Sequence, residues 1–262
     1  MAEETFRFED PDGYERMMGT WSRMAGEIFL EWLAPPPGMR WVDVGCGNGA
    51  FTELLVDRCA PAEVQGFDPS EAQLAFARTR PAARVAQFRQ GDAMAQPFSD
   101  DTFDAAVMAL VIFFVPDPAK AVAEMVRVVR AGGVVAAYAW DMLGGGFPLE
   151  TLQAEMRGLG VTPSLAPSVA ASRMDAMREL WTGAGLEAVE TREITVQRSF
   201  ADFDDVWTTS LLGTSAGRKI KAMPAGDVEL LKDRLRARLT PDGTGRITCT
   251  ARANAIKGRV PA

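Results

Sequence analysis

Three aspartates and one glycine-rich loop are the residues of this sequence whose types and spacing could do chemistry together. Asp43 and Asp68 each follow an apolar run, and Asp92 lies in a loop after a third. Asp68 comes roughly twenty residues past the glycine loop, where a carboxylate can accept hydrogen bonds from both hydroxyls of a ribose. We therefore expect a nucleoside site built from carboxylates and main-chain N–H groups.

The glycine loop is Gly45-Cys46-Gly47-Asn48-Gly49. The apolar residues 39–42 precede it, and apolar side chains recur at helical spacing in residues 51–59, so the order is strand, glycine turn and helix. Glycine permits backbone angles that are closed to residues with a Cβ, and it lets a ligand approach the main chain closely. The new helix then offers free N–H groups and the positive end of its dipole.

Two classes of cofactor could use this loop. Gly45, Gly47 and Ala50 satisfy the Gly-x-Gly-x-x-Gly/Ala pattern of dinucleotide sites, which leaves an NAD(P)-dependent oxidoreductase open. S-adenosylmethionine has no phosphate but carries a carboxylate, an ammonium and a sulfonium, and it favours an acidic residue just before the first glycine, where Asp43 stands. A carboxylate next to a pyrophosphate would be repulsive.

Several segments carry a family resemblance. Residues 43–49, Asp-Val-Gly-Cys-Gly-Asn-Gly, resemble the first motif of the class I S-adenosylmethionine-dependent methyltransferases. Gly91-Asp92-Ala93, Pro97-Phe98 and Phe103-Asp104 closely resemble the third and fourth motifs. The resemblance implies that Asp92 accepts a hydrogen bond from the adenine amino group and that the backbone of Ala93 meets a ring nitrogen. It covers residues 40–141 by motif and the remainder only by the order of the elements.

The same resemblance implies a cofactor-binding set. Pro69 follows the ribose acid, at the place where a side chain packs on the adenine face. Ala109 and Leu110 are expected at the carboxyl end of the fourth strand, where open α/β sheets bind ligands. The expected set is Tyr14, Met18, Trp21, Asp43, Gly45, Cys46, Gly47, Asp68, Pro69, Asp92, Ala93, Ala109 and Leu110. Its first three members lie in a segment that resembles a lid helix over the cofactor, although their spacing suits a helix packed on the core equally well.

The candidate chemistry needs few side chains. The 262 residues include no histidine, which removes the commonest general base and most catalytic metal sites. Three scattered cysteines suit neither zinc nor a disulfide frame, so no metal is expected. Methyl transfer from an activated sulfonium mainly requires proximity, which can be worth roughly 7–11 kcal/mol. If a base is needed, Asp141, at the end of the fifth predicted strand, is the first candidate.

The order of the elements predicts an α/β fold with a doubly wound, mostly parallel sheet. The resemblance makes this a seven-stranded, Rossmann-like sheet of the class I methyltransferase type with a helical cap insertion. We expect four segments: an N-terminal lid helix (1–38), a cofactor-binding core (39–141), a cap insertion (142–171) and a C-terminal completion of the sheet with a helical excursion (172–262). The last strand is expected to pair antiparallel with the sixth.

Composition narrows the partners. The net charge of −7 argues against a general nucleic-acid binder, and no apolar run approaches the roughly 20 residues of a membrane span. We expect neither a nucleic-acid nor a membrane partner, leave a homodimer open, and favour a reducing cytoplasm because the cysteines are few and scattered.

The function predicted from these observations is methyl transfer from S-adenosylmethionine to a small-molecule acceptor at O, N or C, with S-adenosylhomocysteine as product. A non-catalytic protein that binds S-adenosylmethionine or a nucleoside would keep the same residues and is the alternative. An NAD(P)-dependent oxidoreductase is less favoured, because Asp43 and the Gly91-Asp92-Ala93 segment count against it.

Overall fold

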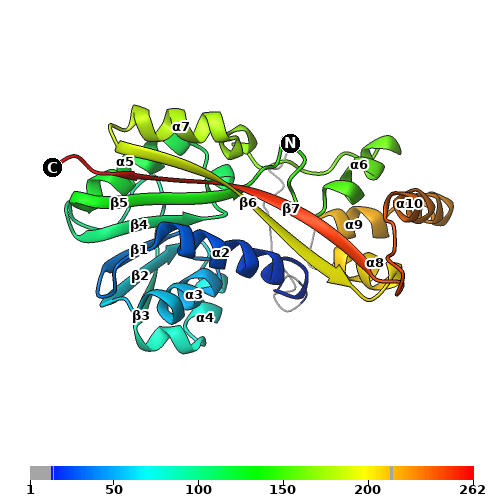
Figure 1. Cartoon of the computed structure of the whole chain (residues 1–262), viewed down its shortest axis with the longest axis horizontal. Helices are drawn as coiled ribbons and strands as arrows, with labels where there is room; N and C mark the ends of the chain where they lie inside the picture. Colours follow the sequence, from blue (N-terminus) through cyan, green and yellow to red (C-terminus); the bar gives the residue numbers. More distant parts are fainter. Residues whose placement is uncertain (1–12, 14, 213–214) are drawn as a thin grey trace. The chain divides into compact units, whose positions relative to one another are not determined.

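The computed structural model describes Gly13, residues 15–212 and residues 215–262. In this part of the chain seven strands form one sheet in the order β3-β2-β1-β4-β5-β7-β6 (Figure 1). The strands are β1 (Arg40–Val44), β2 (Glu63–Asp68), β3 (Ala86–Gln90), β4 (Phe103–Ala109), β5 (Val129–Trp140), β6 (Glu187–Phe200) and β7 (Ile247–Arg259). Neighbours from β3 to β5 pair in parallel, whereas β5 and β7 are antiparallel. The expectation of a mostly parallel, Rossmann-like sheet is confirmed.

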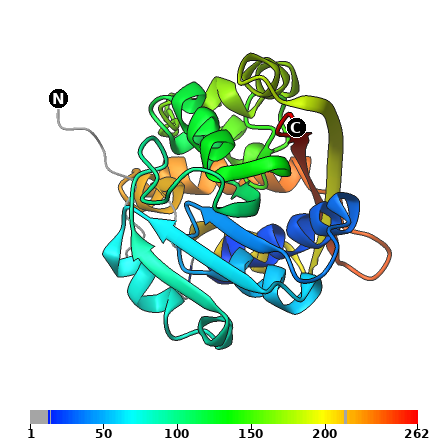
Figure 2. The ribbon, with the colours of Figure 1, turned by 90° about the vertical axis from the view of Figure 1, so that its left-hand side faces the viewer.

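Helices cover both faces of this sheet, with α2, α3 and α4 on one side and α5 and α7 on the other (Figure 1, Figure 2). The helices are α2 (Thr20–Leu33), α3 (Ala50–Cys59), α4 (Glu71–Ala77), α5 (Pro118–Val128), α6 (Glu150–Gly158), α7 (Met174–Gly183), α8 (Phe203–Leu211), α9 (Ser215–Lys221) and α10 (Ala225–Arg238). On the first face, the rings of Phe29 and Phe51 lie 4.8 and 5.7 Å from that of Tyr138 on β5. On the second, Trp181 of α7 donates its indole N–H to the Val135 carbonyl at 2.9 Å.

The chain divides into two compact units. The sheet unit holds Ser22–Gly145, Ala166–Ile194 and Arg252–Ala262. The helical unit holds Met1–Trp21, Gly146–Leu165 and Thr195–Ala251. The helical unit has an apolar cluster of its own, formed by Leu152, Met156, Trp207, Ala216, Ile220, Leu231 and Leu235. The four segments expected from the sequence stay a prediction.

The fourth strand ends earlier than its apolar run suggests. The sequence is nearly all apolar from Ala105 to Val115, but β4 stops at Ala109 and residues 112–114 form a 3₁₀ turn. Ile112 and Phe113 are nevertheless buried, at 0 and 4% exposure. The apolar run therefore predicted the burial of these residues correctly but not their backbone conformation, because a buried turn and a buried strand are both apolar in sequence.

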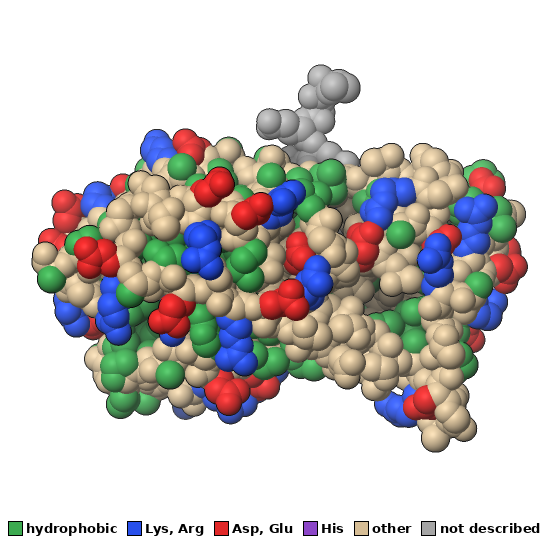
Figure 3. Space-filling model, turned by 45° about the horizontal axis from the view of Figure 1, so that its top comes forward, with side chains coloured by type: hydrophobic (Ala, Val, Ile, Leu, Met, Phe, Trp, Pro, Cys, Tyr) green, Lys and Arg blue, Asp and Glu red, His purple; other side chains and the backbone are tan. Residues whose placement is uncertain are grey.

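The surface carries mixed charge. On the face drawn in Figure 3, basic and acidic side chains are interspersed and form no broad field of one sign. No helix in the described part of the chain is long and apolar enough to cross a bilayer.

Candidate functional site

The candidate site lies where the sheet reverses its direction of growth. Strand β1 pairs with β2 on one side and with β4 on the other, so the chain leaves β1 in one direction and later returns to its opposite edge. In open α/β sheets, ligands bind outside the carboxyl ends of the strands at such a point. The glycine loop follows β1 directly and therefore lies at this place.

The three glycines of the loop have different reasons to be glycine. All have positive φ, at +72° for Gly45, +52° for Gly47 and +79° for Gly49. A Cβ on Gly45 would lie 2.6 Å from the Val111 side chain, and one on Gly49 would lie 3.0 Å from the Cβ of Ala77. A Cβ on Gly47 would meet no atom within 4 Å. Packing therefore explains the first and third glycines, whereas Gly47 faces open space that a ligand could enter.

Asp68 is held against this loop by hydrogen bonds. Its Oδ2 accepts the N–H of Gly47 at 3.0 Å, and its Oδ1 accepts the N–H of Ser70 at 2.9 Å. Burial raises the pKa of this carboxyl, and the two N–H groups oppose the rise. A carboxylate has about four lone-pair positions, so two remain for ligand hydroxyls after these bonds. The ribose role itself stays a prediction.

Asp43 is buried beneath the loop with one oxygen unused. It is 1% exposed, and its Oδ2 accepts the hydroxyl of Thr52 at 2.6 Å. Its Oδ1 has no hydrogen-bond partner among the described residues. Burial raises the pKa of Asp43 to about 7, the Thr52 hydroxyl lowers it by a smaller amount, and the nearby charge of Asp68 raises it further. The loop thus overlies two carboxyl groups that disfavour each other's negative charge, which suits a cationic ligand better than a pyrophosphate.

The loop after β3 meets the end of β2. The N–H of Gly91 donates to the carbonyl of Asp68 at 3.2 Å, and the side chain of Gln90 donates to the carbonyl of Pro69 at 2.9 Å. Asp92 begins a tight turn in which its Oδ1 accepts the Met94 N–H at 2.8 Å. Asp92 and Pro69 are exposed, and Ala93 is half-buried. The structure therefore brings this loop to the end of β2, while the contacts of these residues with an adenine stay predictions.

The carboxyl end of β4 completes the site. Leu110 follows Ala109 with φ at +61°, and its N–H donates to the Tyr138 carbonyl at 2.8 Å. A non-glycine residue with such a φ is held there at a cost and often marks a functional position. The bend after Ala109 carries the chain to Val111, whose side chain fills the space over Gly45. Ala109 and Leu110 thus adjoin the glycine loop, and their contact with the cofactor stays a prediction.

Cys46 is the loop residue with the least to offer a ligand. Its N–H donates to the Phe67 carbonyl at 3.0 Å, and its carbonyl accepts the Gly49 N–H at 2.9 Å. Its thiol points inward, because a Cβ on Gly66 of β2 would lie 3.0 Å from the sulfur. Burial raises the pKa of this thiol, and the charges of Asp43 and Asp68 raise it further, so Cys46 packs as a neutral side chain. Its contact with the cofactor stays a prediction.

Two of the three predicted lid residues, Met18 and Trp21, belong to the helical unit. Tyr14 lies outside the described residues. Met18 and Trp21 are buried, at 4 and 2% exposure. Met18 belongs to a π-helical turn, Glu15–Gly19, whose carbonyls at Arg16 and Met17 accept the Arg198 guanidinium at 3.0 and 2.9 Å. Buried side chains in an anchored turn suit packing, and the lid function stays a prediction.

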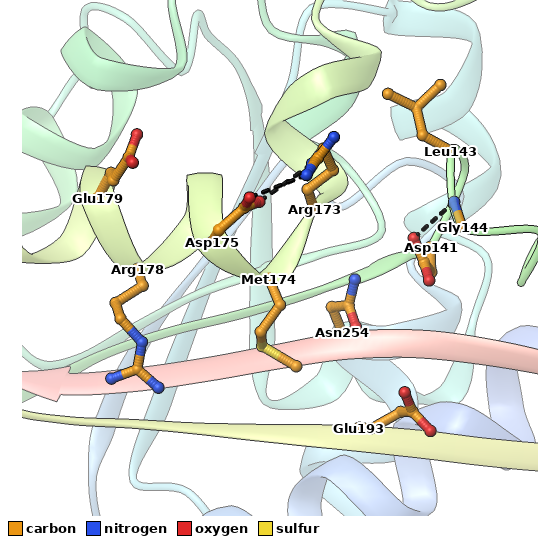
Figure 4. A pocket seen from close by; sticks show the side chains of 10 residues that line it. All are labelled: Asp141, Leu143, Gly144, Arg173, Met174, Asp175, Arg178, Glu179, Glu193 and Asn254. Atoms are coloured by element: carbon orange, nitrogen blue, oxygen red, sulfur yellow. Dashed lines mark hydrogen bonds and ion pairs between the residues drawn. The ribbon is translucent and has the colours of Figure 1, made fainter.

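Asp141 lies in a groove of about 760 Å³ in the sheet unit (Figure 4). Its Oδ1 accepts the Gly144 N–H at 2.9 Å, and its Oδ2 accepts the Arg252 guanidinium at 2.5 and 3.2 Å. Across the groove, Arg173 pairs with Asp175 at 2.9 Å. With both oxygens engaged, Asp141 fixes the turn after β5. These contacts give no support to the role of general base, which stays a prediction.

Two residues of the site were not found by sequence reasoning. Thr52 is buried and donates its hydroxyl to Asp43. The sequence feature that could have identified it is a hydroxyl on the otherwise apolar, buried face of α3. Arg80 donates to the carbonyl of Asn48 inside the glycine loop at 2.6 Å. Nothing in the local sequence marks Arg80, because the contact depends on how α4 packs against the loop. No cluster of metal-ligating side chains occurs among the residues that the structure describes.

Comparison with known proteins places the glycine loop, Asp68 and Asp92 inside one conserved domain. Residues 42–137 match the family described as "Methyltransferase domain". Residues 42–137 therefore carry a methyltransferase domain by their sequence. The matched segment contains every expected cofactor residue except the three of the N-terminal segment.

Two relatives of the chain are named as methyltransferases of quinones. It is 38% identical over 104 residues to a demethylmenaquinone methyltransferase of Desulfitobacterium hafniense, which covers 38% of this chain and 41% of that protein. It is 37% identical over 117 residues to a 2-phytyl-1,4-naphtoquinone methyltransferase of Synechococcus elongatus, covering 43% of this chain and 48% of that protein. The match spans less than half the length of either relative.

Solved structures show the same fold. Phosphoethanolamine N-methyltransferase 2 of Haemonchus contortus, in complex with S-adenosyl-L-methionine, superposes with a TM-score of 0.58 at 17% identity, covering 95% of this chain and 56% of that one. The residues of this site fit S-adenosylmethionine. Among the described residues, Asp68 has lone pairs left after its two hydrogen bonds, Gly47 faces open space, and Oδ1 of Asp43 has no partner.

Proposed function

We propose that this protein transfers the methyl group of S-adenosylmethionine to a small-molecule acceptor. The observation that carries the proposal is the pairing of Asp68 with the N–H of Gly47, beside a buried Asp43 that has no bonded cation among the described residues. A pyrophosphate-bearing ligand would gain ribose hydrogen bonds from Asp68, but the second carboxyl group, Asp43, would disfavour its negative charge. A ligand with a sulfonium, an ammonium and ribose hydroxyls gains from both.

S-adenosylmethionine, when bound, would supply an already activated methyl group on a sulfonium. Its transfer to a nucleophilic acceptor atom would leave the S–C electron pair on sulfur and release a proton from the acceptor. The chain's own contribution is to bind and orient. Asp68 would accept the ribose hydroxyls, Gly47 would admit the ligand to the main chain, and the loop of Asp92 and Ala93 would receive the adenine. Positioning of this kind can supply roughly 7–11 kcal/mol, so a site without histidine is sufficient.

We propose a quinol ring as the acceptor class to test first. Two relatives are named for methylating quinones, one with a phytyl side chain. A reduced quinone has electron-rich ring carbons and hydroxyl oxygens, either of which can attack a sulfonium methyl. The support for a quinol acceptor is the similarity to these two relatives, which covers less than half of each.

Turnover tests this function. We expect S-adenosylhomocysteine to accumulate when the purified chain, S-adenosylmethionine and reduced, unmethylated naphthoquinols of short side chain are incubated together. Asp68→Ala should abolish product formation, and the matched surface variant Asp175→Ala should retain it, since Asp175 is exposed and pairs only locally with Arg173. Tight cofactor binding without product from quinols, phenols or amines would favour the non-catalytic binding protein.

We further propose that the protein acts in a reducing compartment such as the cytoplasm. Cys46, Cys59 and Cys249 are all free thiols, and the first two are buried. A structure that depends on no disulfide is compatible with the thiol-reducing conditions of the cytoplasm.

A further inference from the structure

One arginine joins the glycine loop to the two helices that flank it. Arg80 lies just beyond α4, and its Nε donates to the carbonyl of Asn48 at 2.6 Å. Its Nη1 donates to Oε2 of Glu53, in the first turn of α3, at 2.8 Å. A planar guanidinium holds its donors in a fixed fork, whereas an ammonium group is a compact charge on a flexible stem and does not hold two acceptors in set directions.

The ion pair between Arg80 and Glu53 is partly shielded from water. The side chain of Arg80 is 14% exposed and that of Glu53 is 20% exposed. The guanidinium also lies over the ring of Phe76 on α4, 5.3 Å from its centre. Ion pairs on an open surface contribute little, but pairs that are partly withdrawn from water and held in good geometry are stronger.

Gly49 makes room for this arrangement. A Cβ on Gly49 would lie 3.4 Å from Cδ of Arg80 and 3.0 Å from Cβ of Ala77. Glycine at this position therefore lets the end of α4 approach the loop closely. The end of α4 and Arg80 thus pack against the loop and hold it in place.

The loop needs these contacts because glycine has the largest backbone freedom of all residues. Gly45, Gly47 and Gly49 all adopt positive φ, and an unrestrained chain of this composition samples many other conformations. Asp68 holds one part of the loop through the N–H of Gly47, and Arg80 holds the next part through the carbonyl of Asn48. The side chain of Asn48 in turn accepts the N–H of Ala50 at the start of α3 at 3.1 Å.

We infer that Arg80 is a positioning residue for the cofactor, which acts by holding the glycine loop in the conformation that receives the ligand. The inference rests on the proposed function. It assigns to Arg80 no contact with the reacting atoms. Its consequence is that cofactor affinity depends on a side chain that follows the next helix along the chain.

The test compares Arg80→Lys with Arg78→Lys. Arg78 lies at the end of the same helix, pairs with the exposed Glu71 at 2.5 Å and donates to the Phe88 carbonyl on β3 rather than to the loop. Glu53→Gln is a further variant that removes the ion pair but leaves the bond to Asn48. For each protein we would measure hydrogen exchange of the peptide spanning residues 45–50 without ligand, the melting temperature, and the dissociation constants of S-adenosylmethionine and S-adenosylhomocysteine.

We expect Arg80→Lys to speed exchange in residues 45–50 and to weaken binding of both nucleosides by about tenfold or more. Arg78→Lys should leave both measurements at the wild-type value, and Glu53→Gln should fall between. Unchanged loop exchange and unchanged dissociation constants in Arg80→Lys, with only a lower melting temperature, would overturn the inference and leave the proposed function standing. If the wild-type chain binds neither nucleoside, the proposed function fails and the inference about the cofactor fails with it, whatever the exchange of the loop shows.

Discussion

Replacing Asp43 by asparagine should make this protein more stable at neutral and alkaline pH. Asp43 is 1% exposed, and its pKa is raised to about 7, chiefly by burial. Asparagine has nearly the same shape and can still accept the hydroxyl of Thr52, which Asp43 accepts at 2.6 Å. The variant therefore resembles the protonated form of Asp43 and never carries the buried charge.

The sign and size follow from proton linkage. The pKa of Asp43 in the folded protein, about 7, exceeds its ordinary value of 3.8, so between these pH values the folded state holds a proton that the unfolded state has lost. Raising the pH through this window lowers the free energy of unfolding of the wild type by roughly 1.4 kcal/mol per pH unit, up to roughly 4 kcal/mol in all. Above pH 7 the loss is complete, and it is absent from the Asp43→Asn variant.

Urea unfolding followed by circular dichroism between pH 5 and 9 measures this difference. The control is Asp104→Asn. Partial burial raises the pKa of Asp104, but the N–H of Arg40, the Arg130 side chain and the charges of both arginines together lower it by more, so the pKa lies below its ordinary value. A lowered pKa contributes stability that is lost only below the ordinary value of 3.8, so this variant should differ from the wild type by a constant amount over the whole range.

The reasoning predicts that the stability gained by Asp43→Asn grows from pH 5 to pH 7 and then levels off. If the difference in the free energy of unfolding between variant and wild type stays constant across this range, as for the control, Asp43 is not protonated in the folded state below pH 7. A constant difference in which the variant is the less stable protein would show that Asp43 is stabilised in its charged form, and the ligand preference argued from it would be lost.

The remaining predictions concern the loop, the ribose acid and the N-terminal turn. Gly45→Ala should destabilise the fold by about 1–3 kcal/mol, because the new Cβ would lie 2.6 Å from Val111 at a φ of +72°, and a thermal melt measures this. Gly47→Ala meets no atom within 4 Å, so it should cost only about 1 kcal/mol in a melt but weaken S-adenosylmethionine in a calorimetric titration; equal melts for the two variants would contradict the distinction. Asp68→Ala should weaken the same titration by roughly 1.5–3 kcal/mol, and unchanged affinity would reject the ribose role. Arg198→Met should speed hydrogen exchange in residues 15–19, because the variant lacks the guanidinium that donates to the carbonyls of Arg16 and Met17. Unchanged exchange would show that the turn is stable without Arg198.

The sequence predicted the part of the site that depends on local geometry. Strands of a parallel sheet end at one edge, so Asp68 and the glycine loop had to lie near each other, and Gly47 and Asp68 are bonded at 3.0 Å. The loop's three positive φ values likewise follow from the choice of glycine. These features are short-range consequences of residue type and spacing.

The features that the sequence did not predict depend on tertiary packing. Arg80 reaches Asn48 only because α4 packs behind the loop, and its bond at 2.6 Å has no local signature. The apolar run from Ala105 to Val115 suggested a longer strand, but Leu110 takes a φ of +61° and the run continues as a buried turn. Asp141, at the expected strand end, is paired with Arg252 from β7, a strand more than one hundred residues later in the chain.

The central claim is that the carboxyl ends of the first strands bind a nucleoside with a charged sulfur. Calorimetric titration of the purified chain with S-adenosylmethionine, S-adenosylhomocysteine, NADH and NADPH, each in turn, tests it most directly. We predict one site per chain for the two sulfur nucleosides, with binding weakened about tenfold or more in Asp68→Ala, and no heat from either nicotinamide. Saturable binding of a nicotinamide, or no binding of S-adenosylmethionine, would contradict the claim.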